Sequence, residues 1–276
     1  SMNNFAVNGN LGVVYMPNKV LRFALSESSG FRSPNIDDLA KVFESVVETN
    51  TTPGKLVMPN PDLKPEYAYT TEFSSGLRIN EKYQFTVLGY YTYIQNLIAI
   101  LPGTFNGSDT ILYNNDYVNV YSAQNANEGS IYGLEGTLKI QPFKNTTLTS
   151  TISYTKGQLR FNGARQPLDH IPPVYGKTGI QQFIKNFRIE VFSIYNGWKR
   201  LKDYSNSGED NLPFATADGM PAWFTLNARV GWQINKFFSV QAACENILDA
   251  NYRTFSSNIS APGRKLDLYT ENKHVQ

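Results

Sequence analysis

The stretch Trp223-Phe224-Thr225-Leu226-Asn227-Ala228-Arg229-Val230-Gly231-Trp232-Gln233-Ile234 decides the fold class. Its even-numbered positions from 224 to 234 are all apolar, and Thr225, Asn227, Arg229 and Gln233 stand between them. Because successive side chains of a strand point to opposite faces, this alternation predicts a β-strand with one apolar and one polar face. Soluble strands usually stop at about five or six residues, whereas a strand that crosses a membrane needs about 9–11. The stretch therefore favours a membrane-spanning strand.

Similar runs occur in pairs along the chain. We predict strands at 5–16 and 20–30, 66–79 and 83–98, 130–141 and 146–154, 174–183 and 187–196, and 223–234 and 237–245. One more strand, at 265–269, would bring the total to about eleven. Within each pair the connection is short, as in Asn80-Glu81-Lys82. The sequence thus predicts an all-β fold built from antiparallel hairpins.

The connections between the pairs are long, at 31–64, 101–128, 156–170 and 197–221. Short turns at one end and long loops at the other are typical of an up-and-down transmembrane β-barrel with short periplasmic turns and long extracellular loops. The physical reason is that every backbone group in lipid must be paired within the protein. A soluble β-sandwich would show loops of mixed length at both ends. Within the first long loop, residues 36–47 are expected to form a short amphipathic helix.

Composition narrows the class of protein. Charged residues make up 17% of the chain, below the roughly 25% of an average soluble domain, and aromatic residues make up 13%. The net charge of +2 and the lack of a Lys/Arg-rich run argue against nucleic acid as a partner. A single cysteine, Cys244, excludes an internal disulfide framework and is expected to be a small apolar residue in a strand.

Three segments resemble the TonB-dependent outer-membrane receptors. The first contains Phe31, Arg32 and Pro34; the second contains Asn60, Pro61 and Leu63; the third contains Asn246, Asp249 and Tyr252. They occur in the family's order and span nearly the whole chain. We expect these residues to shape strand ends and loop bases, with Arg32 paired to a carboxylate near the rim and Asn246 and Asp249 capping tight turns.

The resemblance implies a plugged 22-stranded barrel, of which about eleven strands are half. Residues 1–276 would then be the C-terminal part of the barrel, with the plug domain and the first half upstream. The implied protein lies in the outer membrane of a Gram-negative bacterium, contacts outer-membrane lipid, and receives energy from TonB through the plug. One departure concerns the end of the chain, because family members end on a terminal aromatic residue and this sequence ends at Gln276.

The resemblance also implies import of a scarce nutrient. A ferric siderophore is the first candidate ligand and a cobalamin-like nutrient the second; the lack of histidine between Phe31 and Leu63 argues against haem. Loop residues are the candidate contacts. Tyr113, Tyr117 and Tyr121 can stack on an aromatic or chelate ligand, while Arg160, Arg165 and Arg200 can hold an anionic one. The alternative for these arginines is contact with anionic lipid at the rim. A passive porin and a soluble all-β binding or adhesion module remain open as rival functions.

Catalysis and metal binding have little support in the sequence. His170 is one of two histidines and is expected to be structural, because no G-x-S-x-G pattern accompanies it. No His/Cys/carboxylate cluster has the spacing of metal ligands. Asp109, Asp116 and Glu128 form an acidic stretch for which solvation is the first interpretation and Ca²⁺ binding the second. We therefore expect neither an enzyme nor a cofactor.

Overall fold

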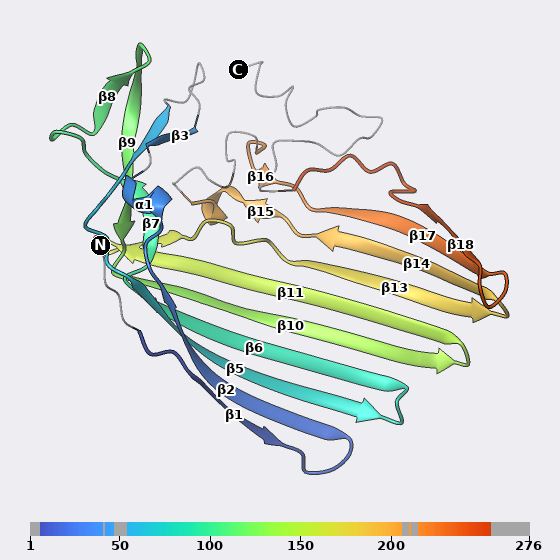
Figure 1. Cartoon of the computed structure of the whole chain (residues 1–276). Helices are drawn as coiled ribbons and strands as arrows, with labels where there is room; N and C mark the ends of the chain where they lie inside the picture. The colour runs from blue at the N-terminus through green and yellow to red at the C-terminus, as the bar shows by residue number, and fades with distance from the viewer. Residues whose placement is uncertain (1–5, 41, 47–53, 206–209, 211–214, 255–276) are drawn as a thin grey trace.

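The computed structural model describes residues 6–40, 42–46, 54–205, 210 and 215–254. Within these ranges, eleven strands form one sheet whose hydrogen-bonded path is β1-β2-β5-β6-β10-β11-β13-β14-β17-β18, with β12 paired to β11 (Figure 1). Their bounds are β1 Asn10–Tyr15, β2 Leu21–Arg32, β5 Glu66–Ile79, β6 Tyr83–Gln95, β10 Glu128–Phe143, β11 Thr146–Phe161, β12 Ala164–Pro167, β13 Tyr175–Ile184, β14 Phe187–Asn196, β17 Trp223–Gln233 and β18 Ser239–Cys244. The sheet is open between β1 and β18 in the described part of the chain.

The predicted hairpins are confirmed. All five pairs are antiparallel, and the short turns lie together at one end of the sheet while the long connections lie at the other (Figure 1). Several short turns place Asn in the left-handed region, such as Asn80 at φ 49° and Asn145 at φ 66°, which Asn tolerates better than most residues. The strand predicted at 265–269 falls outside the described residues.

The register gives the sheet one apolar face. Leu77, Phe85 and Leu138 are aligned across β5, β6 and β10, so their side chains share a face. The same face continues through Ile180, Val191 and Ala228 to Cys244. Many of these side chains are exposed; Phe85 and Val230, for example, are 44% and 41% exposed. An exposed apolar surface of this extent requires a cover, and lipid matches a sheet whose backbone groups are paired internally.

Aromatic rings border the apolar face at both ends. Near the long loops, Tyr69 is aligned with Tyr93, and Tyr91 with Tyr132. Near the short turns, the rings of Phe187 and Trp232 stack with centroids 5.7 Å apart. Aromatic girdles of this kind mark the two membrane–water interfaces of a transmembrane barrel, since such rings combine an apolar body with a polar atom.

A second, smaller sheet lies at the long-loop end. It consists of β3 (Phe43–Val46), β4 (Lys55–Met58), β7 (Ile98–Pro102), β8 (Thr110–Tyr113) and β9 (Asp116–Asn125) in the order β3-β4-β9-β7, with β8 also paired to β9. We call this the crown sheet. The pairing of β4 with β9 is parallel and joins the first long loop to the second. The crown sheet was not predicted.

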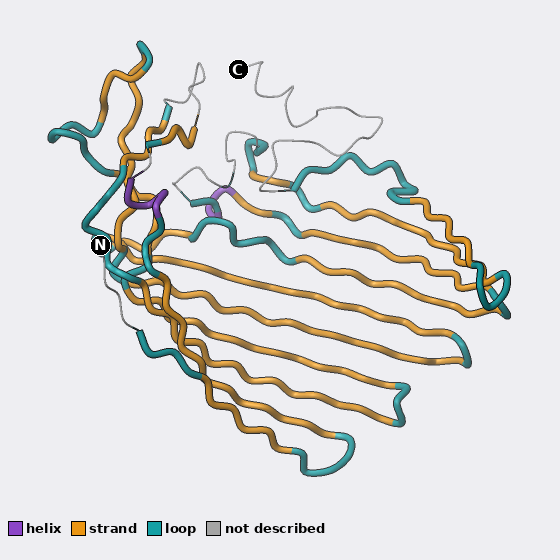
Figure 2. The backbone as a smooth tube through the Cα atoms, in the orientation of Figure 1, coloured by secondary structure: helices purple, strands orange, loops and turns teal. Residues whose placement is uncertain are grey.

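The helix predicted at 36–47 is wrong in extent. The helix α1 covers only Ile36–Ala40, and residues 43–46 form β3 instead (Figure 2). Pairing with β4 gives the backbone of β3 a hydrogen-bonded partner in another segment, which overrides the local helical pattern. The remaining elements at this end are β15 (Lys199–Arg200), the 3₁₀ helix η1 (Leu201–Asp203) and β16 (Gly219–Met220). None of the described helices is both long and apolar enough to cross a bilayer.

Candidate functional site

The long loops fold over the polar face of the sheet and seal part of it. Leu97, Leu101 and Ala126 come from the loops, and they pack with Ile94 and Leu159 of the polar face in one buried cluster. Gly129 packs closely against this cluster, because a Cβ at that position would lie 3.0 Å from Leu97 Cδ2. The crown sheet is thereby fixed above the inner wall instead of extending freely into solvent.

A buried ion pair within the fourth long loop is hydrogen-bonded to the end of the third long loop. Lys199 Nζ lies 2.8 Å from Asp210 Oδ2, and the two side chains are 2% and 0% exposed. Lys199 also donates to the carbonyl of Ile171 at 2.7 Å, while the backbone N–H of His170 donates to Asp210 at 2.7 Å. Burial lowers the pKa of Lys199, and the hydrogen bond to Asp210 opposes that shift. Burial also raises the pKa of the neighbouring Tyr204 to about 12.

The three candidate tyrosines lie in the second loop but do not form one surface. Tyr117 and Tyr121 are on the same face of β9, whereas Tyr113 pairs with Asp116 and points to the other face. Tyr117 is 70% exposed near the tip of the β8–β9 hairpin. Tyr121 lies further from the tip of this hairpin, and Lys55 Nζ lies 4.8 Å from the centre of the Tyr121 ring. Burial raises the pKa of Tyr121. Of the three candidate tyrosines, Tyr121 is therefore the one with a cation beside its ring.

Two of the candidate arginines lie opposite each other on paired strands, and the third lies in the fourth loop. Arg160 lies opposite Glu128 in β10 and opposite Arg165 in β12. Glu128 points to the same side of β10 as Ser130 and Tyr132, so Glu128 and Arg160 lie on the side of the apolar face, beyond its aromatic border. Arg160 binds Glu128 at 3.2 Å, and Arg165 is exposed. Arg200 instead stacks its guanidinium 4.1 Å above the ring of Trp198 in the fourth loop.

The family-motif residues have structural contacts. Arg32 lies 3.5 Å from Glu66, which confirms the predicted pairing, and Pro34 and Leu63 are buried. Asn60 donates to the carbonyl of Ala123 at 2.9 Å and so anchors the base of the crown sheet. Pro61 and Asp249 lie in tight turns, at φ 51° for Asp249. Asn246 brackets Ala250 with two hydrogen bonds of 2.9 Å, and Tyr252 stacks on Trp223 at 4.2 Å.

The polar face carries a group of cations around one aromatic ring, which the sequence analysis did not single out. Phe192 is 3% exposed; Lys177 Nζ lies 4.0 Å from its ring centre and the Arg229 guanidinium 4.8 Å. Lys177 also binds Glu190 at 3.4 Å. We call Lys177, Phe192 and Arg229 the wall cluster. The alternation of polar residues contained this signal, but only the register shows that β13, β14 and β17 bring the three side chains together.

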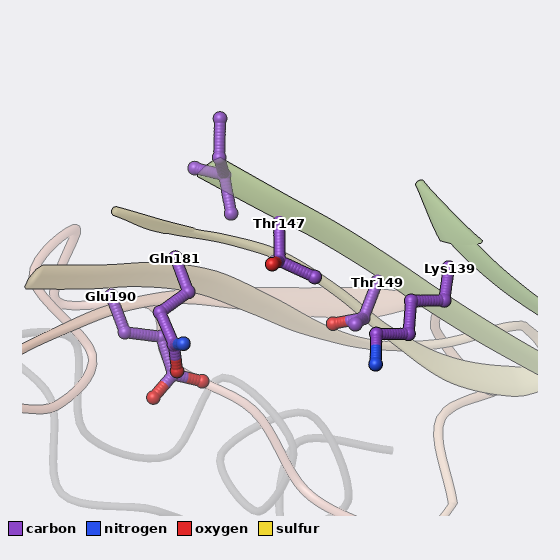
Figure 3. Close-up of a pocket in the computed structure, with 7 residues that line it drawn as sticks. Lys139, Thr147, Thr149, Gln181 and Glu190 are labelled. Carbon is purple, nitrogen blue, oxygen red and sulfur yellow. The ribbon is translucent and has the colours of Figure 1, made fainter. Parts of the chain in front are cut away.

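A shallow recess of about 260 Å³ lies beside the wall cluster on the polar face (Figure 3). Its labelled side chains are Lys139, Thr147, Thr149, Gln181 and Glu190. Hydroxyl, amide and charged groups of both signs line this wall. Such a surface suits hydrogen bonding to a polar ligand or a polar protein segment and lacks the apolar enclosure of a typical small-molecule pocket.

The residues considered for catalysis and metal binding are dispersed. The described residues contain no group of three or more His, Cys, Asp and Glu side chains that could hold a metal ion. Asp109 and Asp116 lie along the β8–β9 hairpin, whereas Glu128 is engaged by Arg160. His170 is 62% exposed with Nδ1 3.7 Å from Asp210, and its φ of 61° places it in a tight turn. The geometry around His170 is that of a loop contact.

Comparison with known proteins decides the family. The model described as "TonB dependent receptor-like, beta-barrel" matches residues 1–247. The chain belongs to this family. It is a family of receptors and transporters, and the chain's antiparallel sheet is the corresponding fold. No curated protein matches the sequence.

Solved structures of the family share the fold at low identity. The copper transporter OprC is similar with a TM-score of 0.70 and 16% identity over 93% of this chain and 37% of that one. The siderophore receptor PirA from Acinetobacter baumannii has a TM-score of 0.65 and 15% identity, and the match covers 93% of this chain and 39% of that one. The FrpB iron transporter from Neisseria meningitidis has a TM-score of 0.67 and 14% identity, and the match covers 93% of this chain and 37% of that one. The receptor chain thus spans between 37% and 39% of the length of these proteins.

Proposed function

We propose that residues 1–276 are the C-terminal part of the barrel of a receptor in the outer membrane of a Gram-negative bacterium. This receptor imports a scarce nutrient with energy passed through TonB. The observation that carries the proposal is the family match over residues 1–247, and the continuous apolar face supports the membrane location. The strands seen here supply the barrel wall and the capture loops. A plug domain and the first half of the barrel, encoded upstream, would supply the remainder.

The proposed ligand is a ferric siderophore, with a cobalamin-like nutrient as the alternative. Structures with this fold include the siderophore receptor PirA and the ferric enterobactin receptor PfeA in complex with enterobactin, which supports the first choice. The wall cluster suits a negatively charged aromatic chelate, because Lys177 and Arg229 offer positive charge beside a ring. Tyr121 and Arg200 are the proposed loop contacts, since each combines an aromatic ring with a cation.

The proposal is tested by uptake in the source organism. Deletion of the gene is expected to abolish uptake of a ⁵⁵Fe-labelled siderophore at nanomolar concentration, and deletion of TonB is expected to do the same. Uptake that continues without TonB would favour a passive porin. A fully soluble gene product in cell fractions would favour the soluble β-module. Normal uptake of every siderophore tested, together with loss of cobalamin uptake, would transfer the assignment to the second ligand.

The ligand contacts are tested by a matched set of variants. Lys177→Gln and Arg229→Gln are each expected to weaken siderophore binding by about tenfold, the effect of losing one charge-assisted hydrogen bond of roughly 1.5 kcal/mol. Lys185→Gln, in the short turn between β13 and β14 at the opposite end, is the control and should bind as the wild type does. Equal affinity in all four proteins would exclude the wall cluster from the ligand site.

A further inference from the structure

Every hairpin of the large sheet carries a lysine in its short turn. These turns join β1 to β2, β5 to β6, β10 to β11, β13 to β14 and β17 to β18. The five side chains, which we call the turn lysines, are all exposed: Lys19, Lys82, Lys144, Lys185 and Lys236. Glu81 is the only acidic residue in the five turns, and it pairs with Arg78. The turn lysines have no ion-pair partner among the residues that the structure describes, so this edge of the sheet is positively charged.

The turn lysines follow one another along a line. Successive hairpins are neighbours in the hydrogen-bonded path of the sheet, and their short turns lie in a row at one end (Figure 1). Because adjacent strands lie about 4.8 Å apart, the turns repeat about every 10 Å, after two strand spacings. The edge therefore presents a series of single, separated positive charges and lacks one compact basic patch.

Asparagine side chains and backbone geometry fix the tips that carry the lysines. Asn18 Oδ1 accepts a hydrogen bond from the backbone N–H of Leu21 at 2.9 Å. Asn235 Oδ1 accepts one from the backbone N–H of Phe237, also at 2.9 Å. Asn145 adopts a φ of 66°, as a tight turn requires. Charges on tips held in this way lose less conformational freedom on binding than charges on a flexible loop.

The tips lie on the water side of the aromatic border. The stacked rings of Phe187 and Trp232 belong to the border nearest the short turns, and Lys185 precedes Phe187 by two positions. Phe143, which is 72% exposed, directly precedes Lys144. Such rings mark the membrane–water interface, and the short turns of an outer-membrane barrel face the periplasm. The turn lysines are thus available to an anionic partner in the periplasm.

We propose that the turn lysines bind peptidoglycan, the linear glycan layer beneath the outer membrane, through the carboxylates of its peptide side chains. The inference rests on the outer-membrane location proposed above. A glycan strand carries its carboxylates at intervals along one axis, so they can meet separated lysines one at a time. Anionic lipid headgroups, in contrast, are recognised by clusters of Lys and Arg, which a repeat of about 10 Å does not provide. The barrel wall is thereby attached to the polymer below it.

Cosedimentation with purified peptidoglycan sacculi tests the inference on the complete receptor in a neutral detergent. The wild-type receptor should sediment with the sacculi, and chemical amidation of the sacculus carboxylates should remove most of this binding. The variant Lys82→Gln/Lys144→Gln/Lys236→Gln should bind about tenfold more weakly, which is roughly twofold for each exposed ion pair that is lost. Vesicles that contain phosphatidylglycerol are the probe for anionic lipid.

Two further variants separate charge from other effects. Replacement of the same three lysines by Arg keeps the positive charge and should retain binding to the sacculi. The matched control Lys64→Gln/Arg165→Gln/Lys202→Gln removes three exposed cations at the long-loop end and should sediment as the wild type does. Siderophore binding takes place at that opposite end of the barrel, so the turn variants should leave it unchanged.

The inference is overturned if the Gln variant and the wild type bind sacculi equally, or if amidated sacculi bind as well as untreated ones. Binding to the vesicles without binding to sacculi would also overturn it and would assign the turn lysines to lipid. Amidation changes only the polymer, so it decides the question even where the Gln variant does not fold. Siderophore uptake is measured in parallel. Uptake without sacculus binding refutes only the role of the turn lysines, whereas sacculus binding without nutrient uptake refutes only the proposed transport.

Discussion

Replacement of Lys199 by Met should release the third and fourth loops from each other. The change removes the 2.8 Å ion pair with Asp210 and the 2.7 Å hydrogen bond to Ile171, and it leaves a carboxylate that is 0% exposed without its cation. Loss of one partner of a buried pair costs about 3–5 kcal/mol. Because about 1.4 kcal/mol corresponds to a tenfold change, amides of residues 168–174 and 199–205 should exchange with solvent one hundred to several thousand times faster, roughly.

Hydrogen exchange of the complete receptor, followed by peptide mass spectrometry, provides the measurement. The double variant Lys199→Met/Asp210→Asn should recover much of the protection, because it removes the unpaired charge and keeps the hydrogen bond from His170 possible. Lys185→Met in a short turn serves as the control for loss of a lysine. An exchange rate in Lys199→Met within about fivefold of the wild type would refute the reasoning, since it would mean that water reaches the pair and screens it.

Three further outcomes are expected. Val87→Arg, midway along the apolar face of β6, should destabilise the barrel in lipid vesicles by about 2–4 kcal/mol in urea unfolding, whereas Thr86→Arg on the polar face should be tolerated; equal effects would invalidate the assignment of the faces. Tyr204→Phe should be neutral or stabilising near pH 7, because its buried hydroxyl has no partner among the described residues. Between pH 10 and 12 the unfolded chain releases the Tyr204 proton, while the folded chain, with a Tyr204 pKa of about 12, keeps it. The wild type should therefore lose up to about 3 kcal/mol of its free energy of unfolding relative to Tyr204→Phe, and parallel pH profiles would contradict this. Asn246→Ala should lower the free energy of unfolding by about 1–2 kcal/mol, because Ala lacks both hydrogen bonds to Ala250 and disfavours a φ of 50°. Hydrogen exchange of residues 246–250 should become faster, and unchanged protection there would show that other contacts hold the turn.

The sheet was predictable because its signal is local. In β17 the apolar side chains alternate with Thr225, Asn227, Arg229 and Gln233, so a period of two specifies both the strand and its faces. The bounds predicted for β14, 187–196, agree with the structure for the same reason. The extension of β11 to Phe161 was missed because the strict alternation of apolar and polar residues ends after Tyr154.

The crown sheet and the loop contacts could not be predicted because their partners are distant in the sequence. Lys55 pairs with Asn119, and no pattern within either segment indicates the other. Lys199 and Asp210 lie within one loop, but their hydrogen-bond partners Ile171 and His170 belong to an earlier segment of the chain that no pattern around Lys199 indicates. Arg160 and Arg165 were predicted in a long loop, whereas the structure places them on β11 and β12, and only the strand register shows that they share one side of these strands.

The parallel pairing of β4 with β9 also sets an order of assembly. Its partners lie on either side of the complete β5–β6 hairpin, so they come together only after that hairpin has formed and brought its upper ends side by side. Contacts between segments so far apart are slow to form, because a long loop must be closed before any pairing offsets its entropy. The crown sheet should therefore form last, after the strands of the large sheet have paired. Until that moment the edges of β4 and β9 are unprotected, which makes this late stage the point at which a folding chaperone or a protease can act on the receptor.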